Sequence, residues 1–250
     1  MERGTRIISI FKQLLSKISY IFSEIFFPSR CESCDIFLSD SNKNSTLCLS
    51  CTQSFYSAYT PMFTCSLCGR RIPELHCSAH PSAIPLFSLF QYSSNTPKDL
   101  IFAFKYRFFE DALSPFFPLI KTALFEYPEL NIYDVLVPIP LHASRFRERG
   151  FNQAELIARI FSESSTPPLP IVHTLKRVKK TLHQAEIHDD EKRKENIAGA
   201  FKALPHIPPQ TSIILVDDVF TTGATTLEAI RTLRALHPKN ILIFTLFRAQ

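Results

Sequence analysis

The most informative segment of the chain is Ile213-Ile214-Leu215-Val216-Asp217-Asp218-Val219-Phe220-Thr221-Thr222-Gly223-Ala224-Thr225. Its first four residues are apolar and predict a short buried strand, with two adjacent carboxylates at the end of that strand. A turn rich in hydroxyl groups comes next and opens a helix that we predict over Thr226–Leu236. The first N–H groups of a helix have no partner within it, so this terminus can hold a phosphate.

The side chains around this turn narrow the chemistry of the ligand. Three hydroxyl groups can add donors, and one glycine lets the backbone approach closely: Thr221, Thr222, Thr225 and Gly223. Asp217 and Asp218 repel phosphate, but they suit a ribose diol or a water-bridged Mg²⁺ beside a pyrophosphate. A sugar with a 5-phosphate and a diphosphate at carbon 1 combines these features. The simpler alternative is an aspartate pair that only caps a helix, and capping requires neither the strand nor the loop.

Further strands and helices alternate along the chain. We predict strands over Leu86–Tyr92, Val135–Ile139, Ile213–Val216 and Ile241–Phe247, and helices over Pro97–Phe109, Ser114–Phe125, Asn152–Ser162 and Thr226–Leu236. Short apolar strands separated by helices favour an α/β fold with a parallel sheet that helices cover on both faces. Ligands of such sheets bind beyond the carboxyl ends of the strands, so we look for chemistry after Val137 and Val216.

Cysteines gather in one part of the sequence. All 7 lie between Cys31 and Cys77. Three Cys-x2-Cys pairs and one Cys-x2-His pair follow one another, and together they offer eight ligands, enough for two tetrahedral Zn²⁺ sites: Cys31, Cys34, Cys48, Cys51, Cys65, Cys68, Cys77 and His80. The spacing leaves open which pairs share an ion. His76 competes with His80, and the x2 spacing favours His80. Closed four-ligand sites indicate structural rather than catalytic zinc.

Composition excludes several classes of protein. The net charge of +5 is too small to indicate a nucleic-acid binder by itself, and only 5 glycines are present. Neither GxGxxG nor GxxxxGK[ST] occurs, which argues against an ATP-driven motor. An odd cysteine count is poor material for disulfides, so thiolate ligands in a reducing cytoplasm are expected.

The first 28 residues predict an amphipathic helix that ends at Pro28. They lack the apolar core of a signal peptide, and Lys12, Lys17 and Glu24 interrupt the run that a membrane span needs. The helix either docks on the body of the protein or lies at a membrane interface. We therefore divide the chain into this helix (1–28), a zinc-binding module (29–82) and an α/β domain (83–250).

The stretch from Val216 to Thr225 closely resembles the 5-phosphoribosyl 1-pyrophosphate (PRPP) motif of type I phosphoribosyltransferases. With the cysteine module, the resemblance narrows to the ComF family of competence-associated, phosphoribosyltransferase-like proteins. Further matching motifs are Phe27-Pro28-Ser29-Arg30-Cys31, Phe104-Lys105-Tyr106, Val137-Pro138-Ile139-Pro140, Arg149-Gly150-Phe151-Asn152-Gln153, Thr181-x2-Gln184, Arg193-x2-Asn196 and Ala200-Phe201. The sequence departs from the family pattern at two positions. Phe220 stands where a smaller aliphatic residue is usual, and we expect it to narrow the site. His80 stands in place of a cysteine.

The resemblance implies a fold and a set of ligand-binding residues. The domain 83–250 is expected to have the type I phosphoribosyltransferase fold. PRPP is expected to contact the aspartates and the turn that follows them, including Ala224, the loop of Pro140 and Leu141, Lys105 and Arg149. The loop after Val137 receives the pyrophosphate in this fold. Arg145 and Arg147 can pair with a diphosphate too, but Arg149 heads a matching motif.

A basic stretch, Lys176 to Lys180, leaves three interpretations open. It can belong to a loop that closes over the substrates, contact a nucleic-acid backbone, or form a solvated charged surface. His183, Gln184, Arg193 and Asn196 follow it.

Two functions of different classes follow from the resemblance. The first is Mg²⁺-dependent phosphoribosyl transfer to an unknown acceptor, with Asp217 and Asp218 as the catalytic residues. The second is a non-enzymatic module that binds single-stranded DNA during uptake, is regulated by PRPP and works with the competence machinery. Aromatic residues could then stack on bases, among them Tyr106, Phe108, Phe109 and Phe151.

Overall fold

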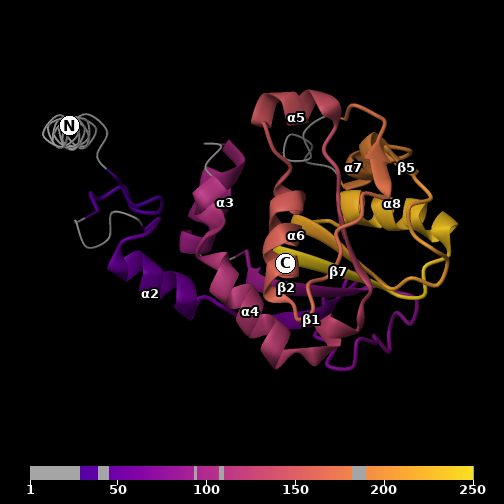
Figure 1. The fold of residues 1–250 in the computed structure, drawn as a ribbon, viewed down its shortest axis with the longest axis horizontal. Coiled ribbons are helices and arrows are strands. Elements are labelled where there is room, and N and C mark those ends of the chain that lie inside the picture. The colour runs from indigo at the N-terminus through magenta and orange to yellow at the C-terminus, as the bar shows by residue number, and fades with distance from the viewer. Residues whose placement is uncertain (1–28, 39–44, 93–94, 107–109, 182–189, 250) are drawn as a thin grey trace, which may run out of the picture.

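The computed structural model describes residues 29–38, 45–92, 95–106, 110–181 and 190–249 (Figure 1). Its elements are α2 (Leu49–Ser57), β1 (Met62–Cys65), β2 (Pro85–Gln91), α3 (Asn95–Tyr106), η2 (Glu110–Leu113), α4 (Phe116–Glu126), η3 (Pro128–Ile132), β3 (Val135–Pro138), α5 (Ala143–Arg149), α6 (Gln153–Ser164), β4 (Leu175–Arg177), α7 (Asp190–Ile197), β5 (Phe201–Ala203), β6 (Ile213–Phe220), α8 (Ala224–Leu233), η5 (Arg234–Leu236) and β7 (Ile241–Arg248). None of the described helices combines the length and the apolar character needed for a membrane span.

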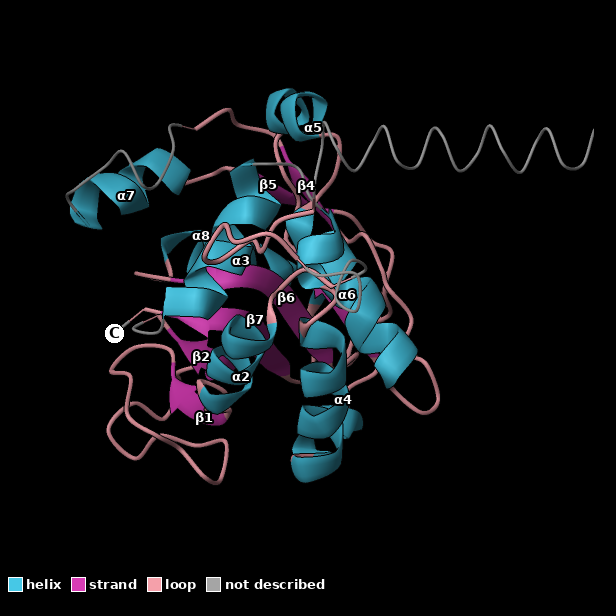
Figure 2. Ribbon diagram, turned by 90° about the vertical axis from the view of Figure 1, so that its left-hand side faces the viewer, coloured by secondary structure: helices cyan, strands magenta, loops and turns pink. Residues whose placement is uncertain are grey.

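A five-stranded sheet in the order β1-β2-β7-β6-β3 forms the centre of the molecule. The pairs β2–β7, β7–β6 and β6–β3 are parallel, whereas the edge strand β1 runs antiparallel to β2. Helices α4 and α6 cover one face and α8 covers the other (Figure 2). The prediction of an α/β fold with a parallel sheet between helices is therefore confirmed. A separate two-stranded sheet pairs β4 with β5.

Strand β6 shows why a continuous apolar run predicts a strand of this sheet. Ile214 and Val216 pack into the core under α4 and α6. Ile213 and Leu215 pack into the core under α8. Successive side chains of a strand point to opposite faces, so a strand covered on both faces needs apolar residues at every position.

The structure corrects the predicted end of this strand. Strand β6 continues through Phe220, so the two aspartates lie within it rather than after it. The cause is the partner strand, because β7 runs alongside and pairs Thr245 with Asp217 and Arg248 with Phe220. Apolar periodicity cannot reveal hydrogen bonds supplied by a distant segment. Helix α8 accordingly begins at Ala224, immediately after the turn.

Residues 29–82 share a sheet and a core with the remainder of the chain. Strand β1 pairs with β2. The rings of Phe55 and Phe90 lie 5.1 Å apart, and those of Phe63 and Phe87 lie 4.8 Å apart. The division at residue 82 stays a prediction, and these contacts are the observations that bear on it. The predicted helix over residues 1–28 lies outside the described residues.

Glu228 of α8 holds the turn between α7 and β5. One of its carboxylate oxygens accepts the N–H of Gly199 at 2.8 Å, and both accept guanidinium N–H groups of Arg231 at 2.7 and 2.8 Å. The hydrogen bonds from Arg231 and then from Gly199 lower the pKa of Glu228, against the effect of burial. We expect Glu228→Gln to lower the unfolding free energy at neutral pH by about 1 kcal/mol, measured by chemical denaturation.

The pH dependence of that loss identifies its cause. A carboxyl group whose pKa is depressed in the folded state stabilises the fold above its unfolded pKa, about 4.3, and this contribution disappears as the pH falls through the folded pKa. The difference between wild type and Glu228→Gln should therefore shrink at acidic pH. Glu163→Gln, an exposed position on α6, serves as the control. A difference that is constant with pH would contradict the ionic origin.

Candidate functional site

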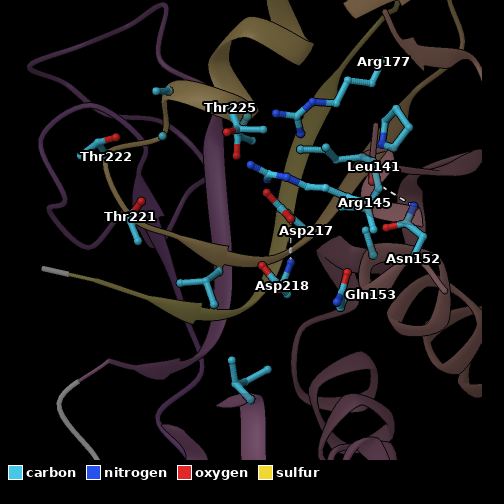
Figure 3. A pocket seen from close by; sticks show the side chains of 18 of the residues that line it. Leu141, Arg145, Asn152, Gln153, Arg177, Asp217, Asp218, Thr221, Thr222 and Thr225 are labelled. Atoms are coloured by element: carbon cyan, nitrogen blue, oxygen red, sulfur yellow. Dashed lines mark hydrogen bonds between the residues drawn. The ribbon is translucent and has the colours of Figure 1, made fainter. Parts of the chain in front are cut away.

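A cavity of about 300 Å³ lies where the carboxyl ends of β3 and β6 meet the N-termini of α6 and α8 (Figure 3). The structure brings ten of the residues predicted for PRPP to this cavity, and all of them line it: Pro140, Leu141, Arg149, Asp217, Asp218, Thr221, Thr222, Gly223, Ala224 and Thr225. They come from three separate segments of the chain. Lys105 lies in α3, but its side chain is outside the part of the chain that the structure describes.

The aspartates form the floor of the cavity. Both are partly exposed, and the backbone N–H of Asp218 donates to Oδ1 of Asp217 at 2.9 Å. Their carboxylates lie between the guanidinium groups on one side and the threonine loop on the other (Figure 3). Carboxylate oxygens in this position can accept sugar hydroxyls or hold a divalent cation.

The loop after β6 is shaped by a glycine and a phenylalanine. Gly223 caps α8 with a φ of 76°, in the left-handed region. A Cβ at this position would lie 2.5 Å from Cζ of Phe220. Phe220 is 4% exposed, packs under α8 and does not line the cavity. The expectation that Phe220 narrows the site is therefore wrong, because its ring fills the core beneath the loop.

Helix α8 directs its first turn at the cavity. Thr221, Thr222 and Thr225 place hydroxyl groups around it (Figure 3). No acidic residue occurs in the first turn of α8. The unpaired N–H groups and the positive end of the helix dipole thus face the cavity without a competing carboxylate in that turn, which favours an anion.

Arg177 is a functional candidate that the sequence analysis left within a basic run. It leaves β4 toward the aspartates (Figure 3). Its Nη2 donates to Oγ1 of Thr181 at 2.6 Å, whereas its Nε is buried with no partner among the described residues. Burial, and then the charge of Arg145, lowers the pKa of Arg177 to about 10. The sequence signal for Arg177 is the alternation of less exposed and more exposed side chains along Leu175-Lys176-Arg177, because this alternation separates Arg177 from exposed Lys176.

Arg145 completes the cationic wall. It lies on α5, lines the cavity, and donates through Nη2 to the carbonyl oxygen of Thr181 at 3.1 Å. Arg149 lines the cavity as well, but Arg147 does not. The positive charges of Arg145 and Arg177 repel each other beside the cavity, and an anion bound between them would offset this repulsion.

The N-terminus of α6 closes the remaining side. Asn152 donates from its side-chain amide to the carbonyl oxygen of Ile139 at 3.0 Å, which ties α6 to the loop after β3. Gln153 is 3% exposed and also lines the cavity. Phe151, an expected base-stacking residue, is buried in the core and unavailable for stacking. The side chains of Tyr106, Phe108, Phe109, His183, Gln184 and Arg193 lie outside the described residues.

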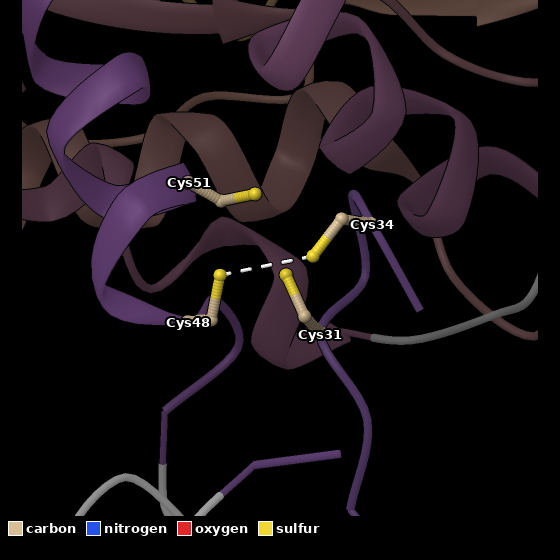
Figure 4. A group of neighbouring side chains, drawn as sticks. All are labelled: Cys31, Cys34, Cys48 and Cys51. Atoms are coloured by element: carbon tan, nitrogen blue, oxygen red, sulfur yellow. Dashed lines mark hydrogen bonds between the residues drawn. The ribbon is translucent and has the colours of Figure 1, made fainter. Parts of the chain in front are cut away.

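Two clusters of candidate metal ligands lie apart from this cavity. The first contains Cys31, Cys34, Cys48 and Cys51 (Figure 4), and the second contains Cys65, Cys68, Cys77 and His80. Within each cluster the ligand atoms all lie within 4.8 Å of one another. The sequence left open which ligand pairs share an ion. In the structure the first two Cys-x2-Cys pairs form one cluster, and the third Cys-x2-Cys pair forms the other with the Cys-x2-His pair.

The geometry of both clusters suits a tetrahedral ion. Cys34 and Cys48 place their sulfurs 3.7 Å apart, and Nδ1 of His80 lies 3.8 Å from the sulfur of Cys77. A tetrahedron with metal–sulfur bonds of about 2.3 Å has ligands roughly 3.8 Å apart. Both clusters could therefore hold a metal ion. His76 is not a member of either cluster.

Hydrogen bonds prepare one cysteine as a ligand. A hydrogen bond from Ser50, and then one from the backbone N–H of Cys51, lowers the pKa of Cys48 to about 6. Burial raises the pKa of Cys51 to about 12. The thiolate is the form that binds metals, so these hydrogen bonds favour the ligand form of Cys48.

Metal analysis tests both clusters. We expect about two ions per chain in the wild type, because each cluster supplies four ligands. His80→Ala should lower this number to about one, whereas His76→Ala, in an exposed position of the same segment, should leave it unchanged. Inductively coupled plasma mass spectrometry of the purified proteins measures both. An unchanged count in His80→Ala would show that His80 is not a ligand.

Comparison with known proteins identifies relatives over part of the chain. No model of a protein family matches it. Competence protein F of Haemophilus influenzae is 33% identical over 123 residues, which cover 48% of this chain and 53% of that protein. Competence protein ComFC of Bacillus subtilis is 38% identical over 43% of this chain and 40% of that protein. DNA utilization protein YhgH of Salmonella typhimurium is 32% identical over 40% and 42%, respectively.

Solved structures are more distant. Adenine phosphoribosyltransferase from Saccharomyces cerevisiae has a TM-score of 0.31 and 15% identity, over 80% of this chain and 89% of that one. A purine phosphoribosyltransferase from Pyrococcus horikoshii has a TM-score of 0.29 and 18% identity, over 53% and 81%. Likeness at this level supports no assignment. The chain spans about half or less of the length of the curated relatives that it matches. Over the matched 40 to 48% of the chain, its resemblance to the ComF family is confirmed by these relatives.

Proposed function

We propose that the cavity binds PRPP together with Mg²⁺ and that the chain transfers the phosphoribosyl group to an acceptor. One observation carries the proposal. A helix N-terminus, an aspartate pair and two arginines, from α8, β6, α5 and β4, converge on one cavity of about 300 Å³. These are the partners that a phosphate, a sugar diol and a diphosphate require.

The 5-phosphate belongs at the N-terminus of α8. The backbone N–H groups that follow Gly223 and the hydroxyls of Thr221, Thr222 and Thr225 supply its hydrogen bonds. A phosphate gains both hydrogen bonds and the favourable end of the helix dipole at such a terminus. This end of the cavity therefore anchors the part of PRPP that does not react.

The ribose lies above the aspartates. Asp217 and Asp218 accept its hydroxyl groups, and these carboxylates, directly or through water, are the residues that would hold Mg²⁺. When bound, Mg²⁺ neutralises the leaving diphosphate and makes it a better leaving group.

The diphosphate belongs beside Arg145 and Arg177. Planar guanidinium groups pair with phosphate oxygens in bidentate fashion, and a binding diphosphate relieves the repulsion between the two cations. The buried Nε of Arg177 has no partner among the described residues, which fits a group that completes its hydrogen bonds with a ligand.

Transfer then requires little chemistry from the protein beyond position and charge. As the bond from carbon 1 to the diphosphate breaks, carbon 1 becomes positive and the departing oxygens gain negative charge. Arg145 and Arg177 stabilise the leaving group, and the carboxylates of Asp217 and Asp218 stabilise the sugar. A nucleophile of the acceptor attacks carbon 1.

We further propose that both cysteine clusters hold structural Zn²⁺. Each cluster supplies four ligand atoms of sulfur or nitrogen, which complete the coordination of the ion and leave no open position.

The relatives named for competence and DNA utilization favour a role in DNA uptake or use inside the cell. They also keep a second function open, in which PRPP regulates binding of single-stranded DNA without transfer. Exposed Phe37 could then stack on a base, while the guanidinium of Arg30, 4.2 Å from the centre of the Phe37 ring, is already paired with Asp35 at 2.9 Å.

A double variant tests the proposed function. We expect Asp217→Asn with Asp218→Asn to abolish PRPP binding in the presence of Mg²⁺, measured by isothermal titration calorimetry, because the variant lacks the cation-binding charges. Binding of single-stranded DNA should remain, as should PRPP binding by Glu126→Gln, an exposed position on α4. Unchanged affinity for PRPP in a folded double variant contradicts the proposal. Diphosphate release with any acceptor from a screen of nucleobases and amines distinguishes transfer from regulation.

A further inference from the structure

Arg248, at the end of β7, lies against the second cysteine cluster. Its Nη1 donates to the carbonyl oxygen of Gly69 at 2.9 Å, directly after Cys68. Gly69 has a φ of 75°, and a Cβ there would overlap Nη2 of Arg248. The guanidinium therefore occupies the space that the glycine leaves open.

Backbone hydrogen bonds of Arg248 and Ala249 reach one residue that lines the cavity and one residue beneath the loop at Gly223. The carbonyl oxygen of Arg248 accepts the N–H of Tyr92 at 2.8 Å, and Tyr92 lines the cavity. The next residue, Ala249, donates its N–H to the carbonyl oxygen of Phe220 at 2.8 Å. Phe220 in turn supports the loop at Gly223. Arg248 thus joins the second cluster, 179 positions away in sequence, to the edge of the ligand site.

We propose that Arg248 is a positioning residue that couples metal binding at the second cluster to the order of the cavity wall. Zn²⁺ with three thiolates and a neutral imidazole carries one negative charge. The guanidinium neutralises that charge, so the metal-loaded cluster holds the end of β7 in place. When the cluster loses its ion, the turn that carries Cys68 and Gly69 is no longer fixed, and the hydrogen bond from Arg248 to the carbonyl oxygen of Gly69 loses its anchor.

The coupling is specific to one of the two clusters. Among the described residues, Arg248 contacts the segment that carries Cys65 and Cys68, whereas the first cluster packs beside α2 and α3. Loss of the ion from the first cluster should therefore leave the end of β7 in order. Cys34 and Cys68 are both exposed ligands, one in each cluster, and provide a matched pair.

Amide hydrogen exchange of zinc-loaded protein tests the proposal without any ligand of the cavity. The amides to follow are Tyr92 and Ala249, whose hydrogen bonds depend on the end of β7. We expect Cys68→Ser and Arg248→Gln each to speed their exchange at least tenfold. Cys34→Ser and the exposed control Arg234→Gln should change it less than twofold. Because coupled groups are not additive, Arg248→Gln should add nothing in the Cys68→Ser background.

Release of zinc to a chelator gives a second measurement on the same variants. Arg248→Gln should release one of two ions several-fold faster than the wild type, and Arg248→Lys should restore part of the difference by retaining the charge. Unchanged exchange of Tyr92 and Ala249 in Arg248→Gln would overturn the proposal. So would equal effects of Cys34→Ser and Cys68→Ser, or faster exchange throughout the sheet. None of these outcomes depends on whether the cavity binds PRPP.

Discussion

Gly223→Ala should lower the unfolding free energy by about 3 kcal/mol and abolish binding at the cavity. The alanine would keep a φ of 76°, which costs roughly 1 kcal/mol, and its Cβ would lie 2.5 Å from Cζ of Phe220. Phe220 is buried and cannot move aside, so overpacking adds about 2 kcal/mol. The first turn of α8 must shift, and its backbone N–H groups then no longer point at the position of the bound phosphate. Chemical denaturation and calorimetry measure the two effects.

Gly150 provides a matched control. Its φ is 81°, but a Cβ there meets nothing within 4 Å, so Gly150→Ala should lower the unfolding free energy by only about 1 kcal/mol.

A second control removes the ring of Phe220, with which Cβ at position 223 would clash. Gly223→Ala in a Phe220→Leu background should therefore also cost about 1 kcal/mol. Equal losses in Gly150→Ala and Gly223→Ala would show that contact with Phe220 does not matter.

Arg177→Met should weaken PRPP binding about ten- to a hundredfold without lowering stability. A hydrogen bond to a charged group contributes about 1.5–3 kcal/mol, and each 1.4 kcal/mol is a factor of ten in affinity. The free protein, by contrast, holds a partly desolvated cation with an unpartnered Nε beside Arg145. An apolar side chain of similar length removes the cost of burying this charge and its repulsion from Arg145, which offsets the loss of the hydrogen bond to Thr181. Calorimetry measures the loss of PRPP affinity, and thermal denaturation measures the unchanged or higher stability.

The neighbouring residue separates this effect from general charge. Lys176 precedes Arg177 on β4 and is exposed. Lys176→Met removes the same charge from the same strand, and we expect PRPP affinity within about threefold of the wild type. If Arg177→Met instead destabilises the protein and leaves the affinity intact, Arg177 is a structural residue.

Much of the fold could be predicted because its sheet is buried on both faces. Four apolar runs predicted β2, β3, β6 and β7, and each of these strands is present. Strand β1 was not predicted, since a cysteine segment ending at Cys65 shows no strand periodicity and its pairing with β2 is a tertiary contact. Helix α5 was also missed, because seven residues rich in arginine show no apolar face.

The candidate site was predictable where its residues are adjacent in sequence. The aspartates and the threonine loop lie within one stretch, as do the Cys-x2-Cys pairs. Arg177 was harder to identify as a site residue, because alternation along β4 separates it only from exposed Lys176, and its approach to Asp217 depends on where the β4–β5 sheet lies in the fold. The pairing of the knuckles and the contact between Arg248 and Gly69 are likewise products of tertiary folding.

We expect the twin aspartates, the helix N-terminus and the two arginines to bind one PRPP molecule together. A crystal structure with Mg²⁺ and PRPP would show whether they do. We predict the 5-phosphate at the N–H groups after Gly223, the ribose hydroxyls at Asp217 and Asp218, and the diphosphate at Arg145 and Arg177. An empty cavity in crystals grown with saturating PRPP, or PRPP bound elsewhere on the molecule, would contradict the account.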